Sequence, residues 1–373
     1  MASKSLSICL LCQNKTVTGC IKAAERAFEG DMNNVMSPAF PQASEHSGQP
    51  LVSVIIPVYQ SPPFIVHTLN SVLAQTFSNY EIIVVNDGSP DTELLEQFLK
   101  PYLARIRYIK QDNLGPSAAR NAAILEARGE FVAFLDSDDL WLPHHLQTQV
   151  ELLQSNPSLS LVYSNTLMVE EDIPIGKGFQ SDGQKRVVTI ETLLTEECTI
   201  GTSTVVASRR AILETGLFDI TLRRCEDFDL WVRMVHRGFR IDYDPGVQTY
   251  YRRNRTGLSA NRELMMLAQI AVFEKFGSLP ITLAQRELLT KQIAGIRARL
   301  DIELAKKSLL AREYDAALQA TKRAATAIDN WKLQVAILGV RYFPRLFRET
   351  FRAYDYVISH RRRLGHPLKD PDI

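Results

Sequence analysis

Between residues 51 and 145 the chain alternates short, continuous apolar runs with segments whose apolar positions recur every three or four residues. Continuous runs of about four to eight apolar residues are typical of strands buried on both faces, and the longer spacing is typical of helices that cover a sheet. The pattern predicts strands at 51–57, 81–85, 106–109 and 131–135, with helices between them at 64–74, 91–100 and 117–127.

Strands that alternate with helices of about ten residues predict right-handed crossovers and a mostly parallel sheet. In such sheets ligands bind beyond the carboxyl ends of the strands. Tyr59, Asp87 and Asp136 each follow the end of a predicted strand, so three strand ends share one rim. We therefore expect an α/β fold with a Rossmann-like, mostly parallel sheet flanked by helices, and a ligand site along this rim.

The strand at 131–135 ends in three carboxylates, Asp136, Asp138 and Asp139, with no basic residue among them. Adjacent acids repel one another unless a cation neutralises them. On an extended segment alternate side chains point the same way, so Asp136 and Asp138 would face one region. Carboxylate oxygens suit Mg²⁺ or Mn²⁺ better than zinc or copper. A simpler alternative is a helix start, with Asp139 as its cap.

The C-terminal part of the chain shows only the helical spacing, which predicts helices at 264–276, 282–309 and 316–328. The segment 311–325 resembles one tetratricopeptide-type unit, and stable arrays of such units need about three. We therefore expect residues 261–373 to form an all-α appendage packed on the preceding domain rather than a repeat array.

A last helical pattern carries an aromatic stripe with arginines beside it. Such a helix could lie on an anionic membrane as a peripheral contact formed by residues 341–363. The alternative, which we favour, is a stripe that packs on the preceding helices while its arginines face water. The stripe consists of Phe343, Phe347, Phe351, Tyr354 and Ile358, and the arginines are Arg341, Arg345, Arg348, Arg352, Arg361, Arg362 and Arg363.

Composition and charge narrow the class of protein. With 45% hydrophobic residues and a net charge of +1, the chain resembles an ordinary globular protein and not a nucleic-acid binder. The charge is uneven, because residues 281–373 hold 18 Lys and Arg against 10 Asp and Glu. Five cysteines, an odd number, favour a reducing compartment, so we expect a cytoplasmic protein. Residues 8–11 form an apolar patch too short to span a membrane, and residues 31–50 have the composition of a flexible lead-in.

Six short motifs follow one another along residues 51–260. The first four are Val54-Ile55-Ile56-Pro57-Val58-Tyr59, Val84-Val85-Asn86-Asp87-Gly88-Ser89, Asn113-Leu114-Gly115-Pro116-Ser117-Ala118-Ala119-Arg120-Asn121 and Leu135-Asp136-Ser137-Asp138-Asp139; the last two are Gly201-Thr202-Ser203 to Gly216-Leu217-Phe218-Asp219, and Cys225-Glu226-Asp227-Phe228-Asp229-Leu230-Trp231-Val232-Arg233. In this order the first four closely resemble the nucleotide-binding half, and the last two the acceptor half, of the family 2 glycosyltransferases, inverting enzymes of the A-type glycosyltransferase fold.

The resemblance implies roles for the residues along the rim. Asp87 would accept a hydrogen bond from the base of the nucleotide, although its sequence context alone fits a turn residue equally well. Asp138, with Asp136, would hold a Mg²⁺ or Mn²⁺ ion that neutralises the leaving diphosphate. Arg120 is a candidate phosphate ligand, or else an exposed helix charge without a role. The residues implied to bind the nucleotide sugar are Pro57, Val58, Tyr59, Asp87, Arg120, Asp136 and Ser137.

The acceptor half would supply the general base. Asp227 stands at the family's base position, where a carboxylate can take the proton from the attacking hydroxyl. Glu226 would support it. In the simpler alternative both acids lie at a helix N-terminus only because the helix dipole favours negative charge there. Asn254 departs from the family pattern, which often has a metal-binding His there, so an Asn oxygen or water would have to fill that place. Arg252 and its neighbours form a loop that could clamp the diphosphate and cover the donor.

We therefore predict a metal-dependent inverting glycosyltransferase that moves a sugar from a nucleoside diphosphate, expected to be UDP, to a hydroxyl of a glycan or lipid-linked glycan in surface-polysaccharide synthesis. A nucleotidyltransferase, which would not need Asp227, and a non-catalytic glycan-binding scaffold are the alternatives. The predicted division is an N-terminal extension at 1–50, a glycosyltransferase domain at 51–260 with halves at 51–145 and 146–260, and a helical region at 261–373.

Overall fold

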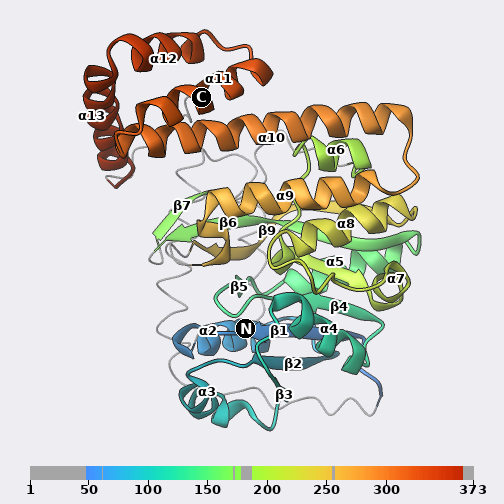
Figure 1. Cartoon of the computed structure of the whole chain (residues 1–373). Helices are drawn as coiled ribbons and strands as arrows, with labels where there is room; N and C mark the ends of the chain where they lie inside the picture. Colours follow the sequence, from blue (N-terminus) through green and yellow to red (C-terminus); the bar gives the residue numbers. More distant parts are fainter. Residues whose placement is uncertain (1–47, 61, 171–172, 178–186, 254–256, 364–373) are drawn as a thin grey trace, which may run out of the picture.

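The computed structural model describes residues 48–60, 62–170, 173–177, 187–253 and 257–363, and a single mixed β-sheet forms its centre (Figure 1). The strands of this sheet are β1 (Val52–Val58), β2 (Tyr80–Asp87), β3 (Arg107–Gln111), β4 (Phe131–Phe134), β5 (Leu140–Trp141), β6 (Leu159–Glu170), β7 (Ile173–Lys177), β8 (Val205–Ser208) and β9 (Arg240–Arg252).

The sheet runs in the order β3-β2-β1-β4-β8-β6-β9-β5, and β7 pairs with β6. The first four strands are parallel, as the alternation of strands and helices predicts. β8 is antiparallel to β4 and to β6, whereas β6 and β9 are parallel to each other. The predicted α/β fold is confirmed, and the departures from parallel order belong to its second half.

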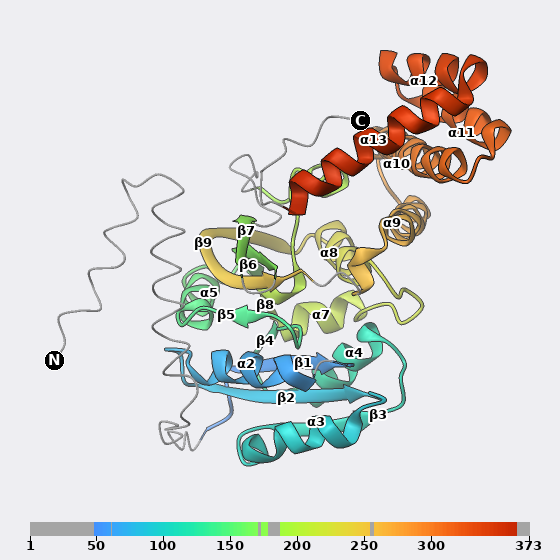
Figure 2. The ribbon, with the colours of Figure 1, turned by 90° about the vertical axis from the view of Figure 1, so that its left-hand side faces the viewer.

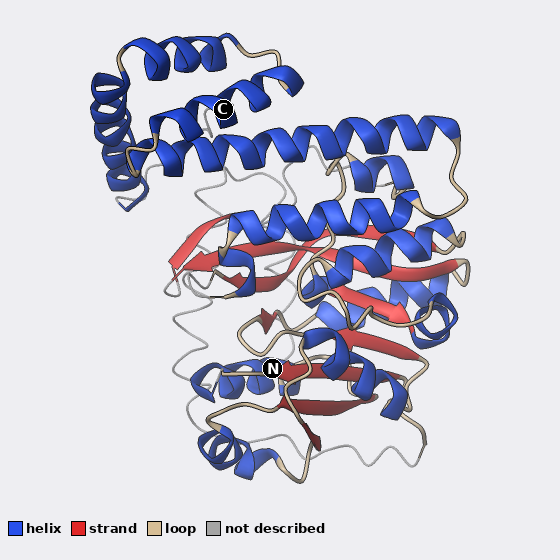
Figure 3. Cartoon of the chain, in the orientation of Figure 1, coloured by secondary structure: helices blue, strands red, loops and turns tan. Residues whose placement is uncertain are grey.

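Helices cover both faces of the sheet and continue into a separate layer beyond it (Figures 1 and 3). The α-helices are α2 (Pro62–Leu73), α3 (Thr92–Leu99), α4 (Pro116–Glu126), α5 (His145–Ser155), α6 (Ile190–Leu194), α7 (Arg209–Thr215), α8 (Glu226–His236), α9 (Arg262–Gly277), α10 (Leu283–Leu310), α11 (Tyr314–Ala327), α12 (Trp331–Tyr342) and α13 (Pro344–Arg363), and the short 3₁₀ helices are η1 (Lys100–Tyr102), η2 (Thr202–Thr204) and η3 (Leu258–Ala260).

Alternate residues of each central strand supply two hydrophobic cores. Val54 and Ile56 of β1 pack on one face with residues of α2, α3 and α5. Ile55 lies on the other face, in a larger cluster with residues of α4 and α6 to α8. Continuous apolar strands are therefore required here, because both faces of the sheet are covered.

α9 and the first half of α10 belong to the larger of these cores. Phe273 and Phe276 of α9, and Leu289 and Ile296 of α10, are buried in the same cluster as the sheet. The second half of α10 packs instead with α11 and α12 in two small clusters. The helical region predicted at 261–373 thus begins inside the core of the preceding fold, and the domain boundaries stay a prediction.

The C-terminal aromatic stripe is divided between the interior and the surface. Phe347 and Phe351 pack against a buried cluster built on α10, α11 and α12. A Cβ at Gly339 of α12 would collide with the Phe347 ring, so glycine is needed where α13 crosses α12. Phe343 and Tyr354 are 66% and 53% exposed, and the side chain of Ile358 lies outside the described residues.

Two aspartates near helix starts make no capping hydrogen bond with their side chains. Asp91 is the N-cap residue of α3, but its carboxylate accepts no hydrogen bond from the helix. It accepts one from Ser89 Oγ instead. Asp139 caps no helix, since α5 starts only at His145 after the short strand β5. In the part of the chain that the structure describes, no helix combines the length and apolar composition needed to cross a bilayer.

Candidate active site

The carboxyl ends of β1, β2 and β4 open into one large cavity of about 1940 Å³, which residues of η2 and α8 also line. A site beyond the strand ends is the arrangement expected of an open α/β sheet. Of the eleven residues predicted for the site, Asn254 lies outside the described residues. The other ten line this cavity: Pro57, Val58, Tyr59, Asp87, Arg120, Asp136, Ser137, Asp138, Glu226 and Asp227.

Asp87, the last residue of β2, is 4% exposed and holds the loop that leads into α4. Its Oδ1 accepts hydrogen bonds from the Gln111 side chain at 2.7 Å and the Leu114 backbone at 3.0 Å, and its Oδ2 accepts from the Gly115 backbone at 2.8 Å. A Cβ at Gly88 would stand 2.5 Å from a backbone nitrogen of that loop, so the next residue must be glycine. Because a carboxylate has about four acceptor sites, Asp87 keeps one for a ligand.

The acidic run after β4 forms a tight turn, in which the Asp139 backbone N–H donates to the Asp136 carbonyl at 3.0 Å. β4 ends at Phe134, so the alternation expected along an extended strand does not apply to the acids. The turn nevertheless brings Asp136 and Asp138 to the cavity wall, whereas Asp139 is completely buried.

Asp139 is a structural carboxylate that joins three parts of the site. Ser203 Oγ in η2 donates to its Oδ2, and the backbone N–H of Arg252 at the end of β9 donates to its Oδ1 at 2.9 Å. Burial, with the charges of Asp138 and Asp136, raises the pKa of Asp139 well above its ordinary value. Its hydrogen bonds fix the turn that carries the other two acids.

Asp138 faces the cavity, and no described Lys or Arg forms an ion pair with its carboxylate. The Arg252 guanidinium donates at 3.1 Å to the backbone carbonyl of Asp138. Burial and the neighbouring Asp136 charge raise the pKa of Asp138 to about 6. A cation bound beside Asp138 would lower the pKa of its carboxyl group and so favour the ionised form, which makes this position suited to a cation. The described residues contain no group of three or more His, Cys, Asp or Glu arranged to hold a metal ion.

Arg120 is buried, so the alternative of an exposed helix charge is wrong. Its Nη2 donates to Asp136 at 2.7 Å and its Nη1 donates to Glu226 at 2.7 Å, while the Phe218 ring lies 5.5 Å from the guanidinium carbon. Burial alone would lower the pKa of Arg120, but the two carboxylates raise it above its ordinary value. This guanidinium joins the acidic turn after β4 to the start of α8.

Asp227 lies in the first turn of α8, opposite η2. Thr202 Oγ1 donates to its Oδ2 at 2.7 Å, and the Phe228 backbone N–H donates to its Oδ1 at 2.7 Å. Burial and the Glu226 charge raise its pKa to about 6, so at neutral pH it is mostly ionised and a stronger base than an ordinary Asp. The carboxylate is therefore both oriented and poised to accept a proton.

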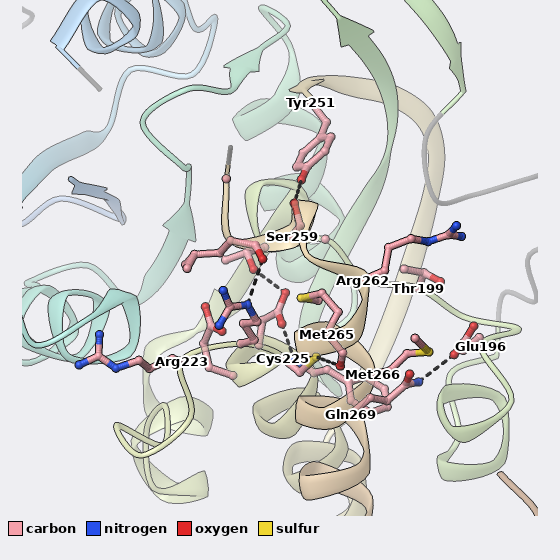
Figure 4. Close-up of a pocket in the computed structure, with 18 of the residues that line it drawn as sticks. Glu196, Thr199, Arg223, Cys225, Tyr251, Ser259, Arg262, Met265, Met266 and Gln269 are labelled. Atoms are coloured by element: carbon pink, nitrogen blue, oxygen red, sulfur yellow. Dashed lines mark hydrogen bonds between the residues drawn. The ribbon is translucent and has the colours of Figure 1, made fainter. Parts of the chain in front are cut away.

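The sequence interpretation missed one wall of the cavity, which α9 provides (Figure 4). Met265 and Met266 lie beside Cys225, whose thiol donates to the Met265 carbonyl at 3.9 Å. Gln269 donates to Glu196 at 2.8 Å, which ties α9 to the segment after α6. These residues lie outside the motifs, and only their one-sided spacing along a helix pointed to packing against the fold.

Comparisons with known proteins agree with this geometry. The family model described as "Glycosyl transferase family 2" matches residues 53–206. A UDP-Glc:alpha-D-GlcNAc-diphosphoundecaprenol beta-1,3-glucosyltransferase of Escherichia coli is 32% identical over 61% of this chain and 87% of the relative. An uncharacterised glycosyltransferase of Methanocaldococcus jannaschii is 32% identical over 52% of this chain and 68% of the relative. The chain belongs to glycosyl transferase family 2. It is accordingly a glycosyltransferase that depends on a nucleotide-sugar donor.

Two solved structures have the same fold, although their sequence identity to this chain is only 18%. Residues 1–349 of Staphylococcus aureus TarS, in complex with UDP-GlcNAc, superpose with a TM-score of 0.56 over 81% of this chain and 91% of that chain. A mannosyltransferase of Pyrobaculum calidifontis, in complex with GDP-Man and Mn²⁺, gives a TM-score of 0.55 over 92% of this chain and 96% of that chain. The A-type glycosyltransferase fold is thereby shown.

Proposed function

We propose that this family 2 enzyme is a metal-dependent inverting glycosyltransferase that uses a UDP-sugar and acts on a lipid-linked glycan in surface-polysaccharide synthesis. The acceptor class is supported by the Escherichia coli relative, whose name specifies a UDP-glucose donor and a diphosphoundecaprenol-linked acceptor. A Bacillus subtilis glycosyltransferase named for teichuronic acid biosynthesis, 30% identical over 57% of this chain and 83% of the relative, supports the same cellular role.

The observation that carries the proposal is one cavity that unites the acidic turn with Asp227. A nucleotidyltransferase would need the acids but no base across the cavity from them. A non-catalytic scaffold would need neither the hydrogen bond from Thr202 that orients Asp227 nor the buried link between Arg120 and Glu226. The arrangement therefore favours glycosyl transfer.

The nucleotide would bind at the ends of β1 and β2. Tyr59, 45% exposed, presents a ring on which a base can stack, and Pro57 and Val58 line the cavity beside it. Asp87 would accept the base N–H with its remaining acceptor site. Its three hydrogen bonds to the protein hold the carboxylate in place before the ligand arrives.

Asp138 and Asp136 are the residues that would hold a divalent cation. Two carboxylate ligands at one rim suit Mg²⁺ or Mn²⁺, which take their other ligands from water and donor phosphates. When bound, such an ion supplies charge neutralisation for the departing nucleoside diphosphate. Asp136 also keeps its ion pair with Arg120, so Asp138 is the more available ligand. The fold neighbour determined with GDP-Man and Mn²⁺ is consistent with this choice.

Asp227 would act as the general base. It accepts the proton of the acceptor hydroxyl while that oxygen attacks the anomeric carbon from the face opposite the leaving group. Thr202 and the Phe228 backbone hold its two oxygens, and Glu226 keeps its pKa raised. Arg120 is assigned a positioning role, because both of its ion pairs are within the protein. Arg252, near the acidic turn, is the described cation best placed to reach a phosphate.

Two substitutions test these roles separately. Asp138→Ala should abolish the increase in melting temperature that a UDP-sugar with Mn²⁺ produces, because ligand binding stabilises by mass action. Asp227→Asn should leave that increase intact and lower the rate of UDP release in the presence of acceptor by about 100-fold to 10,000-fold. Equal loss of donor binding in both variants would contradict the assignment. Release of pyrophosphate rather than UDP would instead indicate a nucleotidyltransferase.

A further inference from the structure

One face of α12 carries large apolar side chains that are half or more exposed. Trp331, Val335, Leu338 and Tyr342 are 72%, 50%, 55% and 59% exposed, and their spacing of three or four residues puts them on one side of the helix. We call these four residues the α12 stripe. A contiguous exposed apolar surface on a folded protein commonly marks an interaction site.

The α12 stripe is distinct from the face by which α12 packs. Leu333 and Val340 are buried in the clusters that join α12 to α10 and α11. Gly339 lies against the Phe347 ring of α13. The helix therefore has an inner face that holds the fold together and an outer face that serves no packing role within the described residues. Figures 1 and 2 show α12 at the outer end of the helical region.

The apolar surface continues past the end of α12. Phe343 and Leu346, at the start of α13, are 66% and 65% exposed. Aromatic residues with a polar edge, such as Trp331 and Tyr342, favour the boundary between lipid headgroups and acyl chains. Of the aromatic stripe predicted from the sequence, Phe343 belongs to this surface, whereas Phe347 and Phe351 are partly buried against the cluster that joins α10, α11 and α12.

The charges on α12 itself have one sign. α12 contains no Asp or Glu, and Lys332 and Arg341 flank the stripe on the helix surface. Arg345, also exposed, follows in α13. Two identical copies facing each other through this surface would place like charges together, which disfavours a dimer. Anionic lipid headgroups complement a basic rim around an apolar centre.

We propose that the α12 stripe, with Phe343 and Leu346, is the surface by which this protein docks on an anionic lipid bilayer. The catalytic cavity extends to the same helix, since Leu333 and Val340 line it from the inner side. Docking through the outer face would therefore place the cavity next to the membrane surface. The proposal does not depend on the acceptor, and it can hold or fail separately from the proposed function.

Tryptophan fluorescence provides a direct reporter of this surface. The chain has three tryptophans, of which Trp141 and Trp231 are 3% and 1% exposed, so only Trp331 can move from water into lipid. Adding vesicles of phosphatidylcholine mixed with phosphatidylglycerol to the full chain should shift the emission to shorter wavelength and protect it from acrylamide. Vesicles of phosphatidylcholine alone should have a much smaller effect, and added salt should weaken the binding.

Substitutions then test whether vesicle binding depends on the α12 stripe or on any exposed apolar residue. The double variant W331A/L338A should reduce the fraction of protein that floats with anionic vesicles by at least about tenfold. Arg341→Gln should reduce it by roughly fivefold, because each basic residue at an anionic surface contributes about 1 kcal/mol. Leu283→Ala removes a 73% exposed leucine at the far end of α10 and should leave flotation unchanged. Circular dichroism and melting temperature verify that each variant is folded.

Three results would overturn the proposal. The first is an absence of flotation of the unmodified protein with anionic vesicles. The second is equal flotation of W331A/L338A and Leu283→Ala. The third is a blue shift of Trp331 that depends on protein concentration without vesicles, together with a dimer by light scattering that W331A/L338A dissolves. That last result would assign the stripe to a second copy of the chain instead.

Discussion

Replacing Arg120 with methionine tests how the two halves of the active site are joined. The Arg120 side chain is 5% exposed and lies 2.7 Å from carboxylate oxygens of both Asp136 and Glu226, and the Glu226 side chain is 10% exposed. Removing one partner of a buried ion pair costs about 3–5 kcal/mol, because it leaves an uncompensated charge. We expect Arg120→Met to lower the free energy of unfolding in urea by about that amount.

The same variant should change the pH dependence of turnover. The Arg120 charge lowers the pKa of Asp227, which burial and Glu226 raise to about 6. Without that charge the pKa of Asp227 rises further, so a larger fraction of the base is protonated at any given pH. Because the proposed base works only when ionised, the acidic limb of the kcat/KM profile should move to higher pH.

A double variant provides the matched control. Arg120→Met combined with Glu226→Gln removes a cation and an anion together, so it should recover part of the lost stability. It also removes the Glu226 charge that raises the pKa of Asp227, so the acidic limb should move back toward its original position. A loss of less than about 1 kcal/mol in Arg120→Met, with an unmoved acidic limb, would refute the reasoning.

Two further predictions concern stability. Gly339→Ala should lower the free energy of unfolding by about 1–3 kcal/mol, because the added Cβ collides with the Phe347 ring. The control is Gly295→Ala in α10, where the added Cβ meets no atom within 4 Å, so the substitution should be neutral or stabilising. Urea titrations of the two variants compare their free energies of unfolding. Burial lowers the pKa of His145 to about 3 from 6.5, so the stability it contributes is complete above pH 6.5 and is lost as the pH falls toward 3. His145→Gln should flatten that decline in unfolding free energy, and an identical decline in both proteins would contradict the assignment to His145.

Strands β1, β2 and β4 of the first half could be predicted because each contains a continuous apolar run. β1 and β4 lie within one residue of the predicted limits at both ends. The carboxyl ends of parallel strands share a rim, which is why Tyr59, Asp87 and Asp136 could be predicted to lie at one site. Hydrophobic periodicity and sheet topology were therefore enough to predict the site residues that directly follow a strand.

The remaining features depend on partners that are distant in sequence. Arg120 looks like a surface charge in an alanine-rich helix, and its burial follows from Glu226, which lies 106 residues away. Asp138 and Asp139 are adjacent and chemically identical, and the hydrogen bonds from Ser203 and the Arg252 backbone make Asp139 the structural one. No local pattern contains this information, because tertiary contacts determine it.

α10 explains why the helical region and the active site should be considered together. It has 28 residues and therefore extends over about 42 Å. Its first half is buried with the sheet through Leu289 and Ile296, and its second half holds α11 and α12 through Ala298 and Leu309. One continuous helix thus belongs to both packing units, so the orientation of α12 relative to the catalytic cavity follows from the core rather than from a linker. A membrane bound to the α12 stripe would accordingly meet Asp227 in a fixed geometry, which a flexible tether could not provide.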